Sequence, residues 1–269
     1  MKSSPFLLVF IAFIIQFHPV WSQSDKQGEF QSLFNKYSVE GSVLVYDLSM
    51  DQEYGYNLQY ADSGFLPAST FKIPNSLIAL DTKIIESSST IIAWDGKPRR
   101  MKIWEKNMTF RKAFHLSCVP CYQEIARKVG AERMNDYLKR FQYGQMDVRS
   151  ENIDLFWLEG EAKISQREQI SFLQKLYLNQ LDIDSLAQIE MKELMIIKRT
   201  ENYTLRGKTG WSIQNGNNNG WFVGYYEIDN NVFFVAVNIS PSDNEQIGDF
   251  KQARRQIAHE ALRILGILK

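Results

Sequence analysis

Residues 220–239 have the sequence GWFVGYYEIDNNVFFVAVNI. Two runs rich in aromatic and β-branched residues, 220–228 and 232–239, flank the polar turn 229–231, a pattern typical of two antiparallel strands. Further strand-like runs lie towards the two ends of the chain, at 41–47, 53–57 and 203–208. The sequence therefore predicts an antiparallel sheet assembled from both ends of the chain.

The middle of the chain has its apolar residues at helical spacing instead. Residues 119–129 and 134–141 repeat them three and four positions apart, and Ser165 with Glu168 forms a capping box in front of another such run. A last amphipathic helix is expected over residues 250–265, and since strands precede it, it should pack on the sheet.

These elements predict an α/β fold of the α+β kind: a central antiparallel sheet flanked by helices, with an inserted, mostly helical lobe. We expect one domain over residues 23–269. Its sheet lobe would comprise about residues 23–66 and 201–269, and its helical lobe about residues 67–200. The cleft between the lobes is the expected ligand site.

The first 22 residues have the three parts of a secretory signal. Lys2 begins it, an apolar run covers residues 6–17, and residues 20–22 form a cleavage site. A membrane anchor is the alternative, but the run is shorter than the roughly 20 residues that span a bilayer. We predict a cleaved signal peptide at residues 1–22, a periplasmic or secreted protein and no stable membrane insertion after cleavage.

Composition excludes several classes of function. The chain has 31 basic and 31 acidic residues, without the excess positive charge of a nucleic-acid binder, so small-molecule chemistry is favoured. Of the three histidines, His18 lies in the signal, and His115 and His259 alone do not make a multi-histidine zinc site. No metal is expected. The sequence also lacks a Gly-x-Ser-x-Gly elbow, so a nucleophile here must be activated without histidine.

Ser69 is the first candidate nucleophile. It precedes Lys72 by three residues at the start of a predicted helix that accepts Pro74 in its first turn. Residues three apart share a helix face, so the lysine amine can reach the hydroxyl. The amine becomes a base if burial removes its proton. The alternative is that Ser69 is a helix cap and Lys72 a solvated side chain.

Two further motifs supply the partners that such a serine needs. Lys208-Thr209-Gly210 ends a strand-like run, where a cation and a hydroxyl can bind a carboxylate, and glycine allows a ligand to approach the backbone closely. Ser117, at the start of the 119–129 helix, can relay a proton to a leaving amine. A phosphate-binding loop is excluded because Asn202 stands where that motif needs glycine.

Five motifs then share the order and comparable gaps of one family. They are Ser69-Thr70-Phe71-Lys72, Ser117-x-Val119, Tyr143-Gly144, Phe156-Trp157-Leu158 and Lys208-Thr209-Gly210. The chain resembles the class D serine β-lactamases, the oxacillinases, over nearly all of its length after the signal. Ser-x-Val in place of Ser-Asp-Asn favours class D over class A.

The resemblance implies that Ser69 is acylated by penicillin-type antibiotics and that the acyl-enzyme is then hydrolysed. It also implies that carbon dioxide carboxylates Lys72 to N6-carboxylysine, which serves as general base, with no other cofactor than carbon dioxide or bicarbonate. Only an uncharged amine reacts with carbon dioxide, so the pocket must be dry. Trp157 also offers an indole N–H to the carbamate. The resemblance implies that four apolar residues exclude water from this pocket: Phe71, Val119, Trp157 and Leu158.

The remaining roles also come from the resemblance. Backbone N–H groups of Ser69 and Trp211 would form the oxyanion hole. Arg254 would bind the substrate carboxylate, with an ordinary surface arginine as the alternative. Trp104 either walls the cleft or belongs to the core.

Two departures from the family pattern stand out. Gln145 replaces the usual Asn after Tyr143-Gly144, so any role of that side chain is in doubt. Cys118 and Cys121 form a Cys-x-x-Cys pair where the family carries apolar residues. We expect two free buried thiols. A disulfide and, less favoured, a redox motif are the alternatives.

Three rival functions remain open. A penicillin-binding or antibiotic-sensing protein would be acylated at Ser69 without turnover. A class A-like enzyme would use Glu159 or Glu161 to activate the deacylating water. A binding module would keep the cleft without the chemistry. We expect the loop 212–220 to govern substrate preference.

Overall fold

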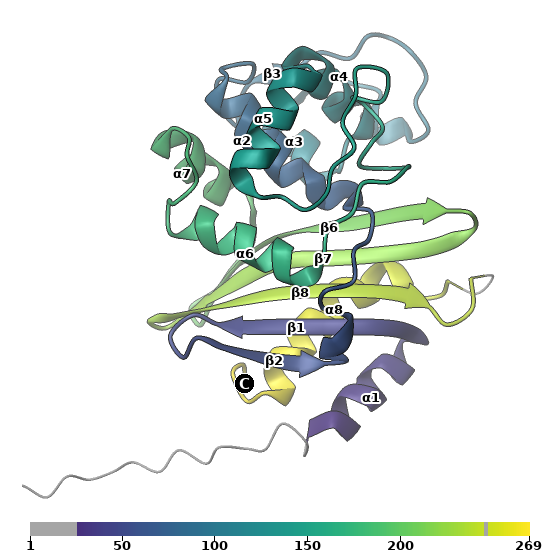
Figure 1. Ribbon diagram of the computed structural model, residues 1–269, viewed down its shortest axis with the longest axis vertical. Helices are drawn as coiled ribbons and strands as arrows, with labels where there is room; N and C mark the ends of the chain where they lie inside the picture. The colour runs from purple at the N-terminus through teal and green to yellow at the C-terminus, as the bar shows by residue number, and fades with distance from the viewer. Residues whose placement is uncertain (1–25, 245–246) are drawn as a thin grey trace, which may run out of the picture.

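A computed structural model describes residues 26–244 and 247–269; the predicted signal peptide lies outside these residues. Six strands form one antiparallel sheet in the order β2-β1-β8-β7-β6-β5 (Figure 1). Its strands are β1 (Val39–Asp47), β2 (Gln52–Tyr56), β5 (Ile196–Arg199), β6 (Thr204–Gln214), β7 (Asn217–Ile228) and β8 (Asn231–Pro241). A separate ribbon pairs β3 (Ile91–Ile92) with β4 (Met108–Thr109). The predicted fold class is confirmed.

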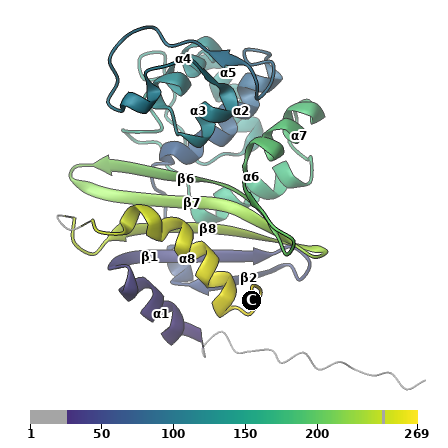
Figure 2. The same cartoon turned by 180° about the vertical axis from the view of Figure 1, so that it is seen from behind.

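Helices cover both faces of the sheet (Figures 1 and 2). The α-helices are α1 (Gln27–Lys36), α2 (Lys72–Asp81), α3 (Phe110–His115), α4 (Val119–Val129), α5 (Ala131–Phe141), α6 (Gln166–Tyr177), α7 (Ser185–Leu194) and α8 (Phe250–Ile264). Helices α1 and α8 lie on one face, while the helical lobe, which includes α6, lies on the other. None of the described helices combines the length and apolar character needed to span a bilayer.

The strands are apolar on both sides because each side faces a core. On β8, Val235 and Val237 pack with α1 and α8, whereas Phe234 and Ala236 pack with the helical lobe. Alternate side chains of a strand point to opposite faces, so one run of hydrophobic residues supplies both cores.

Local signals fix several boundaries. The predicted capping box is present: the Ser165 hydroxyl accepts from the Glu168 N–H, and the Glu168 carboxylate accepts from the Ser165 N–H. The turn between β6 and β7 is tighter than the polar run 215–220 suggests. Asn215 and Gly216 alone form it, both with positive φ, and β7 already begins at Asn217.

Within the six-stranded sheet, β5 was not predicted from the sequence, and neither were the two short strands β3 and β4 of the separate ribbon. The edge strand β5 has four residues and lacks an apolar–polar alternation. It pairs with β6 no further than Arg206. Beyond this pairing, β6 packs against the short helix η3 (Ala68–Phe71), with Gly210 next to Thr70. The sheet thereby brings the Lys208 motif next to Ser69.

Candidate active site

Ser69 and Lys72 lie at the junction of two helices. Ser69 is in η3, and Lys72 is the first residue of α2, so the chain stays helical between them. The Lys72 Nζ lies 3.2 Å from the Ser69 Oγ. Ser69 keeps 9% of its surface exposed and Lys72 keeps 0%. The hydroxyl therefore remains accessible while the amine beside it is buried.

The surroundings of Lys72 are dry. Its Nζ lies 4.9 Å from the centre of the Tyr122 ring, which is itself fully buried. Burial lowers the pKa of the Lys72 ammonium well below its usual value, and the Lys208 charge lowers it further. Lys72 is therefore poised to be an uncharged amine.

Trp157 packs against Phe71, the residue directly before Lys72. Its ring stacks on Phe71 at 5.3 Å, and its backbone oxygen accepts from the Ala68 N–H at 2.8 Å. Ala68 has a φ of 50°, so this bond supports a strained turn directly before Ser69. Among the described residues, the buried Trp157 Nε1 has no hydrogen-bond acceptor. A buried donor without a partner is costly, so this N–H is a candidate to bind an anionic group.

A second serine–lysine pair faces the first. The Lys208 Nζ, on β6, donates to the Ser117 Oγ at 2.5 Å and to the Thr209 oxygen at 3.1 Å. Ser117 lies in the turn between α3 and α4 and has a φ of 50°. Burial, aided by the charge of Arg254, lowers the pKa of Lys208 to about 7. A proton can therefore leave or join this pair near neutral pH.

Gly210 lies where β6 packs against η3. A Cβ at this position would lie 3.0 Å from the Pro67 oxygen and 3.2 Å from the Thr70 Cγ2. The absence of a side chain thus lets β6 approach η3 closely. Thr209, its half-buried neighbour, has its side chain on the other face of the strand.

Arg254 is not an ordinary surface arginine. It is 5% exposed, its Nη1 donates to the Gly210 oxygen, and its guanidinium lies 5.8 Å from the centre of the Trp211 ring. Burial lowers its pKa to about 10. The Trp211 Nε1 donates to the Asn218 Oδ1 at 2.8 Å, which fixes the ring. The structure thus places a largely desolvated cation beside the Lys208 motif.

The other predicted pocket residues separate into two groups. Val119 and Leu158 are half-buried and pack against the helical-lobe core. Trp104 is 8% exposed and belongs to that core, where its Nε1 donates to the Leu116 oxygen at 3.2 Å. Of the two interpretations offered for Trp104, the structure supports the core position.

Known proteins resemble this chain in sequence and in fold. A model of the penicillin binding protein transpeptidase domain matches residues 23–263. The chain is 38% identical to beta-lactamase OXA-48 of Klebsiella pneumoniae, over 94% of each chain. It is 41% identical to beta-lactamase OXA-10 of Pseudomonas aeruginosa, over 79% of this chain and 80% of that one. The solved class D beta-lactamase of Sebaldella termitidis has a TM-score of 0.85 at 36% identity, covering 90% of this chain and 97% of that one.

The chain belongs to the class D β-lactamase family. As a class D β-lactamase it is a serine hydrolase, and its family needs no metal cofactor. Within residues 26–244 and 247–269, no three His, Cys, Asp or Glu side chains cluster to hold a metal ion.

Gln145, where this class D β-lactamase departs from the family's usual Asn, is held through its backbone. Its N–H donates to the Lys163 oxygen at 2.8 Å, and the Lys163 N–H donates back at 2.7 Å. The Gln145 side chain is exposed. A change of side chain therefore leaves the local pairing intact.

The prediction of two free thiols is wrong. Cys118 and Cys121 form a disulfide, with their Cα atoms 5.4 Å apart. The first turn of α4 brings residues three apart together, which the Cys-x-x-Cys spacing allows. The family carries apolar residues at these two positions, so the family pattern gave no indication of a disulfide.

Several residues that support the β-lactamase site were not predicted from the sequence. Tyr122 appeared as one apolar position of a helix, yet its hydroxyl lies 2.7 Å from the Ser76 Oγ next to Lys72. Gln169 donates to the Thr70 Oγ1 at 2.9 Å and accepts from the Tyr143 hydroxyl at 3.2 Å. Polar residues inside an otherwise apolar helix face were the available signal, but they do not reveal their partners.

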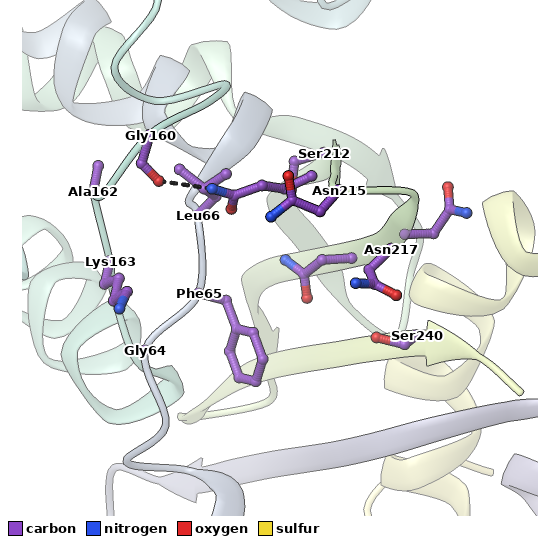
Figure 3. A pocket seen from close by; sticks show the side chains of 13 residues that line it. Gly64, Phe65, Leu66, Gly160, Ala162, Lys163, Ser212, Asn215, Asn217 and Ser240 are labelled. Atoms are coloured by element: carbon purple, nitrogen blue, oxygen red, sulfur yellow. Dashed lines mark hydrogen bonds between the residues drawn. The ribbon is translucent and has the colours of Figure 1, made fainter. Parts of the chain in front are cut away.

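A cavity of about 270 Å³ lies at the end of the β6–β7 hairpin (Figure 3). Segments 64–66 and 160–163 form one side of it, and residues 212–219 contribute the other. The Gln214 Nε2 donates to the Gly160 oxygen at 3.1 Å and joins the two sides. Neither Ser69 nor Lys72 lines this cavity. The hairpin that we expect to govern substrate preference is thus tied to the loop that follows Trp157.

Proposed function

We propose that this enzyme hydrolyses the amide bond of penicillin-type β-lactams through an acyl-enzyme on Ser69, and thereby gives resistance to these antibiotics. The observation that carries the proposal is the Ser69 hydroxyl 3.2 Å from a fully buried amine. Serine is a weak nucleophile until a neighbouring base takes its proton, and a desolvated lysine is such a base.

We assign the proton donor to the second pair. When Ser69 attacks the lactam carbonyl, the ring nitrogen leaves and needs a proton. Ser117 supplies it, because its hydroxyl is already bonded to the Lys208 ammonium, which favours release of the hydroxyl proton. Lys208 and Thr209 also bind the substrate carboxylate, with Arg254 behind them adding positive charge.

The pocket suits a carboxylated Lys72. An uncharged amine adds to carbon dioxide, and the buried Trp157 Nε1, which lacks an acceptor among the described residues, would donate to the new carboxylate. This carboxylate would accept the Ser69 proton during acylation and would activate the water that hydrolyses the acyl-enzyme. Phe71, Val119 and Leu158 keep water away from it.

The negative charge that develops on the lactam oxygen needs donors. We assign this oxyanion hole to the backbone N–H groups of Ser69 and Trp211, which lie on η3 and β6 where those two elements pack together. Losing one such donor typically costs about 100 to 1,000-fold in turnover.

We further propose that residues 1–22 are a signal peptide and that the mature enzyme, residues 23–269, acts in the periplasm or outside the cell. Its target antibiotics act on the cell envelope, so hydrolysis there protects the cell. Mass spectrometry of the secreted or periplasmic protein would test the cleavage site: a mature N-terminus other than residue 23 would contradict the boundary.

One experiment tests the proposed function against its rivals. Purified enzyme is mixed with a chromogenic cephalosporin, and both sustained turnover and adduct mass are followed. We expect turnover through a transient adduct on Ser69, and neither with Ser69→Ala. A stable adduct without turnover would indicate a sensor, and the absence of both would indicate a binding module.

A further inference from the structure

The Cys118–Cys121 disulfide lies inside the catalytic motif. Cys118 stands between Ser117 and Val119, and it is the N-cap of α4, where its Sγ accepts from the Cys121 N–H at 3.3 Å. Cys118 is 0% exposed and Cys121 is 8% exposed. The disulfide therefore joins the residue after the proposed proton donor to the first turn of a well-packed helix.

The turn that carries Ser117 is strained. Its φ of 50° places a non-glycine residue in the left-handed region, a conformation that persists only when the surroundings hold it. Backbone bonds support both sides: the Ser117 N–H donates to the Phe114 oxygen at 3.1 Å, and the Cys118 N–H donates to the Ala113 oxygen at 2.9 Å. The disulfide adds a covalent constraint on the following residue.

We propose that the Cys118–Cys121 disulfide is a positioning element for catalysis, which holds the Ser117 hydroxyl against the Lys208 ammonium. The inference rests on the proposed function and adds a dependence of the reaction rate on the oxidation state of this pair.

Packing determines which part of the chain moves when the disulfide is broken. Two thiols need more room than two bonded sulfur atoms, and Cys118 is enclosed by the helical-lobe core. Helix α4 is anchored by Tyr122, Ile125 and Ala126, all buried. The strained turn at Ser117 is the less constrained side and absorbs the shift. Displacement of a catalytic group by about 1 Å typically costs on the order of 100-fold in rate.

Reduction proceeds through Cys121, the less deeply buried of the two cysteines. A thiolate of a small dithiol attacks the Cys121 Sγ, and the S–S bond breaks with its electron pair leaving on the Cys118 sulfur, which takes up a proton. The second thiol of the reagent then displaces the Cys121 sulfur and forms the cyclic disulfide of the reagent. Two electrons and two protons pass from the dithiol to the protein. The chain has 2 cysteines, so thiol titration reports this bond alone.

The test compares oxidised, reduced and Cys118→Ala/Cys121→Ala enzyme with a chromogenic cephalosporin, well below the unfolding temperature of each form. We expect reduction to lower the acylation rate about 10 to 100-fold, reoxidation to restore it, and the double variant to stay slow with or without dithiol. Unfolding temperatures measured in parallel separate rate from stability.

Ser117→Ala supplies the matched background. If the disulfide acts by positioning the Ser117 hydroxyl, reduction leaves the residual rate of Ser117→Ala unchanged, because the group it positions is gone. Equal slowing in both backgrounds, or full activity of reduced wild type, would overturn the proposal. Absence of turnover by oxidised wild type would instead refute the proposed function itself and, with it, this inference.

Discussion

The two serine–lysine pairs of the site have the same side chains, but they differ in how the chain brings the two residues together and in the length of the serine–lysine hydrogen bond. Ser69 and Lys72 come from one continuous helical segment, and the lysine is fully buried. Ser117 and Lys208 come from different lobes, 91 residues apart, and the ammonium donates directly to the hydroxyl. We propose that the first pair removes a proton and that the second delivers one. Environment, not residue type, assigns the two roles.

Replacing each serine gives the largest expected effects and tests the assignment directly. Ser69→Ala should abolish the covalent adduct and lower turnover by at least about 10⁴-fold, because no nucleophile remains. Ser117→Ala should keep the adduct but lower the acylation rate by about 100 to 10⁴-fold, the usual range for general acid–base catalysis. Adduct mass and single-turnover kinetics distinguish the two variants. A covalent adduct on Ser69→Ala would show that Ser69 is not the nucleophile.

The dry pair should respond to carbon dioxide and to acid. The pKa of Lys72 lies below its usual value, so its amine is uncharged above that pKa and takes a proton as the pH falls through it. We expect kcat/KM to fall on acidification or on removal of bicarbonate, and bicarbonate to restore it. Insensitivity to both would contradict a carboxylated base.

Trp157→Phe sharpens the test of a carboxylated Lys72, because phenylalanine keeps an aromatic ring at this position but lacks the indole N–H. Hydrogen bonds to charged groups contribute about 1.5–3 kcal/mol, so turnover should fall roughly 10 to 100-fold. More bicarbonate should be needed for half-maximal activity. Wild-type bicarbonate dependence in this variant would show that the indole N–H holds no carboxylate.

The second pair should give the alkaline limb of the pH profile. Lys208 has a pKa of about 7, so its ammonium is lost as the pH rises past neutrality. We expect kcat/KM to decline above pH 7, and kcat to decline at higher pH because a bound carboxylate raises the lysine pKa. Lys208→Arg, which stays charged, should remove the limb in kcat/KM. Persistence of the limb in this variant would assign it to another group.

Gln145→Asn should have the smallest effect. The exposed side chain lies outside both pairs and the residue is held by backbone bonds to Lys163, so we expect kcat/KM and stability to stay within about twofold and 0.5 kcal/mol. Steady-state kinetics and thermal unfolding measure both. A larger loss would mean that the family's usual Asn has a role that the glutamine only partly fills.

The sequence determined what depends on neighbours along the chain. Strand runs with two apolar faces, helical periodicity and the Ser165–Glu168 capping box gave the fold class, because these signals follow from backbone geometry. The spacing of Ser69 and Lys72 likewise brought hydroxyl and amine within reach, since a helical turn places residues three apart together.

Tertiary structure alone decided the rest. The distance from Ser117 to Lys208, the burial of Arg254 and the partner of Tyr122 depend on how β6 packs against η3 and the helical lobe. The shifted pKa values follow from that burial, which no local pattern encodes. The Cys118–Cys121 disulfide depends on both: the spacing in the sequence allowed it, but only the turn into α4 brought the two sulfur atoms together.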